Sequence, residues 1–139
     1  MRVMAIDYGD ARTGVAISDG AGLLAGFTVV LPSREEAGLL DELERLIRER
    51  GVDELVLGLP RNMDGTEGPR GAVSRAFGAK LAARTGLEVR LWDERRTTIE
   101  AHQILHATGK RMRKHKKTVD AVAATLILEG YLARKRLGR

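Results

Sequence analysis

Three segments with β-strand character stand at the start of the chain, and helical periodicity begins only after them. These segments are Arg2–Ile6, Thr13–Ser18 and Leu24–Leu31. They are separated by two turn-forming stretches, Asp7-Tyr8-Gly9-Asp10 and Asp19-Gly20-Ala21-Gly22, and Pro32 ends the third segment. Strands joined by such short turns pair antiparallel, so this part of the chain predicts a three-stranded meander.

Helices and strands alternate along the rest of the chain. We predict a helix from Ser33 to Gly51, a strand Glu54–Leu59, a helix through Val73, Phe77 and Leu81 that ends at Gly86, a strand Glu88–Trp92, a helix from Thr97 to Gly109 and a last helix from about Thr118 to Lys135. Two of these helices follow capping-box patterns, Ser33-Arg34-Glu35-Glu36 and Thr97-Thr98-Ile99-Glu100. The order βββαβαβαα makes the fourth and fifth strands parallel to the first. A five-stranded mixed sheet flanked by helices is the α/β arrangement of ribonuclease H-like domains.

Length and composition agree with one such domain over residues 1–139. The chain is 43% apolar and 31% charged, which is typical of a globular protein. The absence of cysteine excludes disulfides, iron–sulfur clusters and thiolate zinc sites, and it fits a reducing cytoplasm. The longest apolar runs are far below the ~20 residues that span a bilayer. We therefore expect a cytoplasmic protein without a secretory signal or a membrane partner.

Positive charge is concentrated near the C-terminus. Residues 1–100 carry 14 basic and 17 acidic side chains, whereas residues 101–139 carry 10 basic and 2 acidic ones. Six of the eight residues in Lys110–Lys117 are basic. Such a run is usually a solvated loop, but next to a nucleic-acid site it acts as an electrostatic clamp. Lys114, Lys116 and Lys117 are its candidate substrate contacts. The five aromatic residues are too few for base stacking to be the main binding mode.

Carboxylates occupy three positions that the predicted topology brings toward one edge of the sheet. Asp7 follows the first strand, Asp93 and Glu94 follow the fifth, and Asp120 lies at the start of the last helix. Parallel strands have their carboxyl ends at a common edge. Hard divalent cations take carboxylate ligands, and two such ions can align the attacking water and the leaving oxygen of a phosphodiester. We therefore predict that Asp7, Glu94 and Asp120 bind Mg²⁺ or Mn²⁺ and are catalytic.

Each of these acids also has a simpler explanation. Asp7 could merely form a turn, Asp120 could complement the helix dipole, and Glu94 could pair with a neighbouring arginine. Adjacent residues of a strand point to opposite faces, so only one of Asp93 and Glu94 is expected to face the metal. The coincidence of three acids at strand ends and a helix start favours the metal site.

A polar loop follows the fourth strand at the same edge. Its residues, Arg61-Asn62-Met63-Asp64-Gly65-Thr66, offer amide and hydroxyl groups, and the next helix offers its free N–H groups, so the loop suits a phosphate. The alternative is an ordinary strand–helix loop in which Asp64 or Thr66 caps the helix. Both interpretations agree with the sequence.

Four sequence blocks together resemble the signature of the YqgF (RuvX) family. The blocks are DYGDARTGVAISD from Asp7, GLPRNMDGT from Gly58, DERRTT from Asp93 and VDAVAA from Val119. They cover nearly the whole chain in the family's order. The family consists of bacterial RNase H-like proteins that are similar to the RuvC Holliday junction resolvases.

The resemblance implies a cytoplasmic nuclease that matures the 5′ end of 16S ribosomal RNA, with Holliday junction resolution as an older proposal. By the motif match, Asp7, Glu94 and Asp120 correspond to the family's acidic site. The four-carboxylate set of RuvC is not fully matched, because no second acid follows Asp120 within one helical turn.

We therefore expect a Mg²⁺- or Mn²⁺-dependent hydrolase of structured RNA, with ribosomal particles as further partners, that is a monomer or a weak homodimer. The residues expected to position the phosphates are Arg12, Asn62, Arg95 and Arg96. One alternative is a DNA junction resolvase, which would cut two strands as a symmetric dimer. Another is a catalytically weak RNA-binding factor of ribosome assembly that depends on the basic C-terminal region. An ATPase of the actin and hexokinase superfamily would need two such domains.

Overall fold

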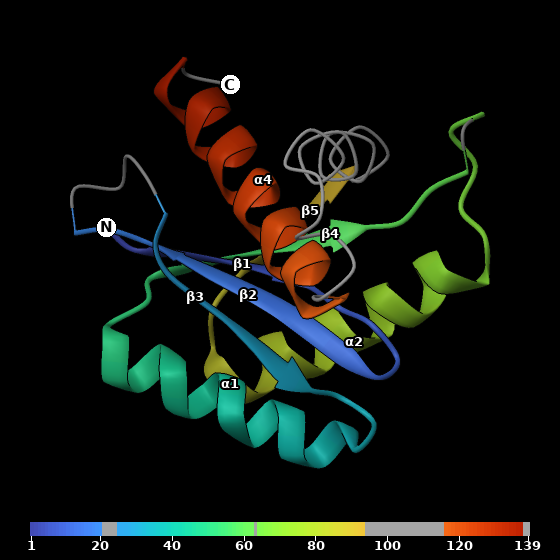
Figure 1. Ribbon diagram of the computed structural model, residues 1–139, viewed down its shortest axis with the longest axis horizontal. Coiled ribbons are helices and arrows are strands. Elements are labelled where there is room, and N and C mark those ends of the chain that lie inside the picture. Colours follow the sequence, from blue (N-terminus) through green and yellow to red (C-terminus); the bar gives the residue numbers. More distant parts are fainter. Residues whose placement is uncertain (21–24, 63, 94–115, 138–139) are drawn as a thin grey trace.

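The structure is a computed structural model that describes residues 1–20, 25–62, 64–93 and 116–137, of which 116–121 are described only by their place in a helix. Five strands form one sheet with the order β3-β2-β1-β4-β5 (Figure 1). The described elements are β1 (Val3–Asp7), β2 (Arg12–Ser18), β3 (Ala25–Pro32), α1 (Glu36–Arg50), β4 (Glu54–Leu59), α2 (Pro69–Thr85), β5 (Val89–Asp93) and α4 (Lys116–Arg136). Their order confirms the prediction. The helix predicted from Thr97 to Gly109 lies outside the described residues.

Strand pairing brings three strand ends to one side of the sheet. β1 pairs antiparallel with β2, which pairs antiparallel with β3. β1 also pairs parallel with β4, and β4 pairs parallel with β5, in which Leu59 is opposite Asp93. The carboxyl ends of β1, β4 and β5 therefore share an edge, which we call the carboxyl edge.

The two faces of the sheet are covered by different helices (Figure 1). On one face, α1 and α2 pack on large side chains such as Met4, Ile6 and Leu57, with Phe77 of α2 buried among them. On the other face, α4 packs on smaller ones. The members of this second cluster are Val3, Ala5, Ala16, Val56, Ala124, Ile127, Leu128 and Leu132. We call these the α1/α2 face and the α4 face.

Helix α4 runs opposite to β1 and β4. The Nζ atom of Lys135 contacts Glu54, the first residue of β4, and Met1 next to β1. The last turns of α4 therefore lie over the strand starts, and its first turns lie toward the carboxyl edge (Figure 1). None of the helices in the described ranges has both the length and the apolar character of a membrane span.

The helix ends confirm some local predictions and correct others. Gly51 and Gly86 end α1 and α2 with φ values of 64° and 73°, as predicted. The capping box at Ser33 was wrong: the N-cap of α1 is Glu35, which makes no side-chain cap bond. The Ser33 hydroxyl instead donates to the Gly9 carbonyl at 2.6 Å.

Two further corrections concern helix boundaries and faces. Val73 is 43% exposed, whereas Phe77 and Leu81 of the same helix are buried. Lys116 and Lys117 belong to the first turn of α4 rather than to a loop. The positively charged run therefore reaches into the helix that covers the α4 face.

Candidate functional site

Asp7 lies at the carboxyl edge on the α4 face. It is the last residue of β1 and half-buried. Val3 and Ala5 of the same strand pack against α4, so the alternation of strand side chains puts Asp7 on the α4 face too. Tyr8, the next residue, belongs to the opposite face, where its ring stacks on Phe77 with centroids 4.1 Å apart. The position predicted for Asp7 at this edge is therefore present in the fold.

The end of β5 fixes the face of the sheet on which Asp93 lies. Trp92 packs with the α4 cluster and meets Tyr131 of α4 edge-on, at a centroid distance of 6.3 Å. Asp93 follows Trp92 in the same strand and therefore lies on the α1/α2 face, opposite to Asp7. Glu94 lies outside the described residues.

Position 120 lies in the part of α4 nearest the carboxyl edge. Because α4 begins at Lys116, Asp120 is in its second turn rather than its first, and the described helix has no acid in its first turn. The helix dipole acts mainly within the first turn, so it explains an acid at position 120 less well than the sequence indicated. One turn later, Ala124 is fully buried in the cluster that also contains Val3 and Ala5 of β1.

Arg12 opens β2 next to Asp7. Gly14 of β2 pairs with Asp7, and Ala16 packs on the α4 face, so Arg12 lies on that face as well. The fold thus brings these two predicted site residues to one face and edge. Three other predicted substrate contacts, Arg95, Arg96 and Lys114, lie outside the described residues.

The turn after Asp7 is narrow and held by hydrogen bonds. A Cβ atom on Gly9 would come within 2.4 Å of the Arg12 carbonyl oxygen, so only glycine fits there. The Gly9 N–H donates to the Thr13 hydroxyl at 3.4 Å, and the Gly9 carbonyl accepts from Ser33. The local sequence pattern predicted a helix cap at Ser33. The actual partner, Gly9, is 24 residues away in the chain, so no local pattern could indicate it.

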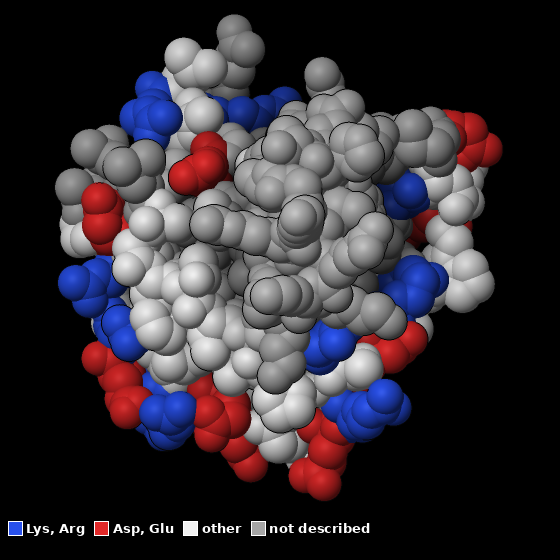
Figure 2. Space-filling view, in the orientation of Figure 1, with Lys and Arg blue, Asp and Glu red and all other residues white. Residues whose placement is uncertain are grey.

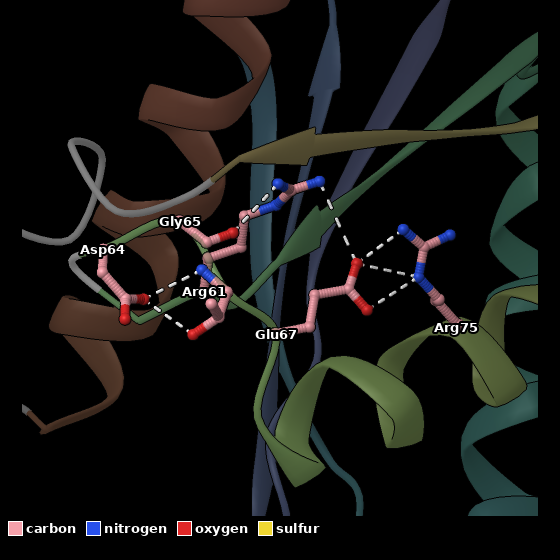
Figure 3. A network of polar contacts seen from close by, with 6 residues as sticks. Arg61, Asp64, Gly65, Glu67 and Arg75 are labelled. Atoms are coloured by element: carbon pink, nitrogen blue, oxygen red, sulfur yellow. Dashed lines mark hydrogen bonds and ion pairs between the residues drawn. The ribbon is translucent and has the colours of Figure 1, made fainter.

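The loop between β4 and α2 is closed by its own polar groups (Figure 3). The Asn62 side-chain amide donates to the Thr66 hydroxyl at 3.0 Å. The Thr66 backbone N–H and hydroxyl both donate to Asp64 Oδ1, at 3.0 and 2.7 Å. The alternative that Asp64 or Thr66 caps α2 was wrong, because the N-cap is Gly68. Asn62 is exposed at the carboxyl edge.

Arginines of the β4–α2 loop and of α2 are interspersed with acids. Glu67 lies between Arg61, at 3.9 Å, and Arg75, at 2.5 Å (Figure 3). The Arg75 guanidinium, by its hydrogen bonds, holds the pKa of Glu67 below its usual range. Arg61 also donates to the Gly65 carbonyl at 3.3 Å. Figure 2 shows basic and acidic side chains interspersed on the side where Figure 1 places this loop and α2.

The predicted metal ligands Asp7, Glu94 and Asp120 are all carboxylates. Asp7 is the only one of the three whose side chain is described, and the described residues hold no group of three His, Cys, Asp or Glu side chains that could bind an ion. The chemistry of the predicted set, three carboxylates without nitrogen or sulfur, fits Mg²⁺ or Mn²⁺.

Comparisons with known proteins identify the family. The sequence model of the RuvX family, described as Holliday junction resolvase, matches residues 1–134. A relative from Moorella thermoacetica, named "Putative pre-16S rRNA nuclease", is 44% identical over 134 residues, which cover 96% of each chain. The chain belongs to the RuvX family. The resemblance found in the four sequence blocks is thereby confirmed.

Solved structures similar to this RuvX-family chain confirm its fold. The RuvC structure from Thermus thermophilus matches with a TM-score of 0.61 and 14% identity, and the match covers 98% of this chain and 97% of that one. A fowlpox virus resolvase, solved with Holliday junction DNA, matches with a TM-score of 0.60 and 11% identity over 97% and 99% of the two chains. At these identities the likeness shows the shared RuvC-like, RNase H-like fold.

Proposed function

We propose that this RuvX-family chain is a Mg²⁺- or Mn²⁺-dependent nuclease that hydrolyses phosphodiester bonds in the 5′ leader of pre-16S rRNA. The observation that carries the proposal is the position of Asp7, at the carboxyl edge and on the face that α4 covers. The name of the curated relatives supports the RNA substrate. The natural substrate would be this RNA within a ribosomal particle in the cytoplasm.

We assign Glu94 and Asp120 to the same site as Asp7. Asp93 lies on the opposite face of β5, which favours Glu94 as the ligand of the pair. Asp120 is one turn before Ala124, which is buried in the same cluster as Val3 and Ala5 of β1, and α4 points its first turns toward the carboxyl edge. These placements support a common site for carboxylates that are far apart in the chain.

The residues of this chain would bind the substrate and the ion as follows. Asp7, Glu94 and Asp120 would supply the oxygen ligands of the cation, which when bound activates water and neutralises phosphate charge. Arg12, on the face of Asp7, would hold the phosphate to be cut, together with Asn62, Arg95 and Arg96. Lys114, Lys116 and Lys117 would hold neighbouring phosphates and make binding depend on salt concentration.

A second candidate function is resolution of DNA junctions, which the description of the family favours. It requires two sites that cut symmetrically, and hence a dimer. RNA processing and junction resolution use the same acidic site, so the substrate and the oligomeric state distinguish them.

The test compares the full chain with its Asp7→Asn and Asp41→Asn variants. Asp41 is a matched control, because it is an exposed acid of α1 that pairs with Arg84 on the α1/α2 side of the sheet. The substrates are a transcript with the 16S 5′ leader and a four-way DNA junction, each with Mg²⁺, Mn²⁺ or EDTA. We expect Mg²⁺-dependent production of the mature 5′ end, a loss of about a thousandfold in Asp7→Asn with RNA binding retained, and normal activity in Asp41→Asn.

Two outcomes contradict the proposal. Cleavage that continues in EDTA, or at full rate in Asp7→Asn, excludes a metal site built on Asp7. Cleavage of the junction by a dimer, with the transcript left intact, supports the second candidate instead.

A further inference from the structure

One arginine of α2, Arg70, contacts the turn that follows Asp7. Arg70 Nη1 donates to Asp10 Oδ1 at 2.6 Å, and Arg70 Nη2 donates to the Tyr8 carbonyl at 3.1 Å. The Arg70 guanidinium carbon also lies 5.8 Å from the centre of the Tyr8 ring. One planar side chain thus contacts two of the three residues after Asp7.

Packing of Phe77 holds helix α2 in the orientation that these Arg70 contacts require. The Tyr8 ring stacks on Phe77 with an interplanar angle of 6°, and Phe77 is 1% exposed. Arg70 and Phe77 are seven residues, or two turns, apart and therefore lie on the same side of α2. Pro69 starts the helix directly before Arg70. The stack and the guanidinium together tie the turn to the helix.

Ser33 holds the same turn from the other flank. Its hydroxyl donates to the Gly9 carbonyl at 2.6 Å, and its backbone N–H donates to the Ala11 carbonyl at 2.9 Å. Ser33 is 4% exposed, and no site function or helix cap accounts for its hydroxyl. Each residue from Tyr8 to Ala11 therefore has an external anchor, which is the backbone carbonyl at Tyr8, Gly9 and Ala11 and the side chain at Asp10.

We propose that Arg70 is a positioning residue that fixes the direction of the chain after Asp7 and so keeps this carboxylate in place for the cation. The inference rests on the proposed function, since it assigns Asp7 to the metal. Stability alone does not explain the ion pair between Arg70 and Asp10. The two side chains are 41% and 87% exposed, and exposed ion pairs stabilise little. The two donors from one rigid fork suit a role in geometry, which a lysine could fill only in part.

The test measures Mn²⁺ binding by electron paramagnetic resonance and amide hydrogen exchange of residues 8–11 in the full chain. For Arg70→Ala we expect Mn²⁺ affinity to fall about tenfold, the Mg²⁺ concentration for half-maximal transcript cleavage to rise by a similar factor, and exchange in the turn to accelerate. Arg70→Lys should lie between Arg70→Ala and wild type. Ser33→Ala should accelerate exchange in the same residues, because it frees the Gly9 carbonyl.

Arg84→Ala is the matched control for a general effect of losing an arginine. Arg84 belongs to the same helix and pairs with Asp41 and Glu44 of α1, at 2.6 and 3.0 Å, away from the carboxyl edge. We expect it to leave Mn²⁺ affinity and exchange in the turn unchanged. Normal Mn²⁺ binding in Arg70→Ala, or an equal loss in Arg84→Ala, would overturn the inference. A wild-type chain that binds no Mn²⁺ would instead contradict the proposed function, before any variant is compared.

Discussion

The two faces of the sheet are built from the same strands but differ in what they contribute. The α1/α2 face is filled with large aliphatic and aromatic side chains, and Leu55, Leu57, Phe77 and Leu81 are essentially inaccessible. The cluster on the α4 face contains Ala5, Ala16 and Ala124 together with valine, isoleucine and leucine side chains. Because the alanine side chains are small, α4 packs close to the strands. Its first turns lie toward the edge where β1 ends.

The two faces divide stability and the proposed chemistry between them. The large side chains of the α1/α2 face supply most of the apolar burial, which is the dominant favourable term in folding. The α4 face carries the proposed site residues Asp7 and Arg12 at the border of its smaller core. Substitutions that act on one face only can therefore test whether the two tasks are separable.

The largest expected effect comes from the neighbouring acids at the end of β5. Glu94→Gln should lower the cleavage rate about a thousandfold, because it removes a charged ligand of the proposed cation. Asp93→Asn is its control on the opposite face and should change the rate less than about threefold. Rates of transcript cleavage at saturating Mg²⁺ measure both. A reversed order of the two variants would assign Asp93 to the site and contradict the face assignment.

Neighbouring residues of β4 compare the two faces in stability. Leu57→Ala, on the α1/α2 face, should lower the free energy of unfolding by about 2–5 kcal/mol, because it leaves a cavity among large side chains. Val56→Ala, on the α4 face, removes fewer carbons and should cost about 2 kcal/mol. Urea unfolding at equilibrium measures both. A larger loss for Val56→Ala would show that the α4 face is the dominant core.

Close packing of α4 is tested by enlarging its contact with the sheet. Ala124→Leu should cost about 1–3 kcal/mol of stability, because the fully buried site has no room for three more carbons. It should also lower the cleavage rate of the folded protein, since it displaces the helix that carries Asp120. Ala76→Leu, at an exposed position of α2, is the control. Unchanged activity in folded Ala124→Leu would separate the site from the packing of α4.

The smallest effect concerns Tyr8 and alkaline pH. Burial raises the pKa of the Tyr8 hydroxyl above its ordinary 10.0, and the Glu36 carboxylate adds to the shift. The stability that the protonated hydroxyl contributes is complete below pH 10 and is lost as the pH rises through the folded-state pKa. Tyr8→Phe keeps the ring and should lose less stability than wild type between pH 9 and pH 11 in urea titrations. Equal losses would show that Tyr8 titrates normally.

Much of the fold follows from local patterns in the sequence. Short apolar or β-rich runs without helical spacing, bounded by turn residues, locate the strands to within one or two residues. Gly51 and Gly86 mark the helix ends because each adopts a positive φ. The carboxyl edge follows from the order of strands and helices, so Asp7 could be placed there from the sequence. Alternation within β5 then places Asp93 on the α1/α2 face once Trp92 is seen against α4.

What the sequence could not predict depends on contacts between distant residues. Ser33 has the local pattern of a helix cap, but its hydroxyl bonds to Gly9, and Arg70 reaches Tyr8 and Asp10, about 60 residues earlier. Neither contact has a local signal, because any arginine or serine near a helix start looks the same in the sequence. Asp64 and Thr66 similarly close their own loop instead of capping α2.

The most direct test of this account is a crystal of the full chain soaked in Mn²⁺ and measured for anomalous scattering. We predict an ion at the carboxyl edge, on the α4 face, with carboxylate oxygens of Asp7, Glu94 and Asp120 as its protein ligands. An anomalous map with the ion bound elsewhere, or coordinates in which these three carboxylates lie on separate surfaces, would contradict it.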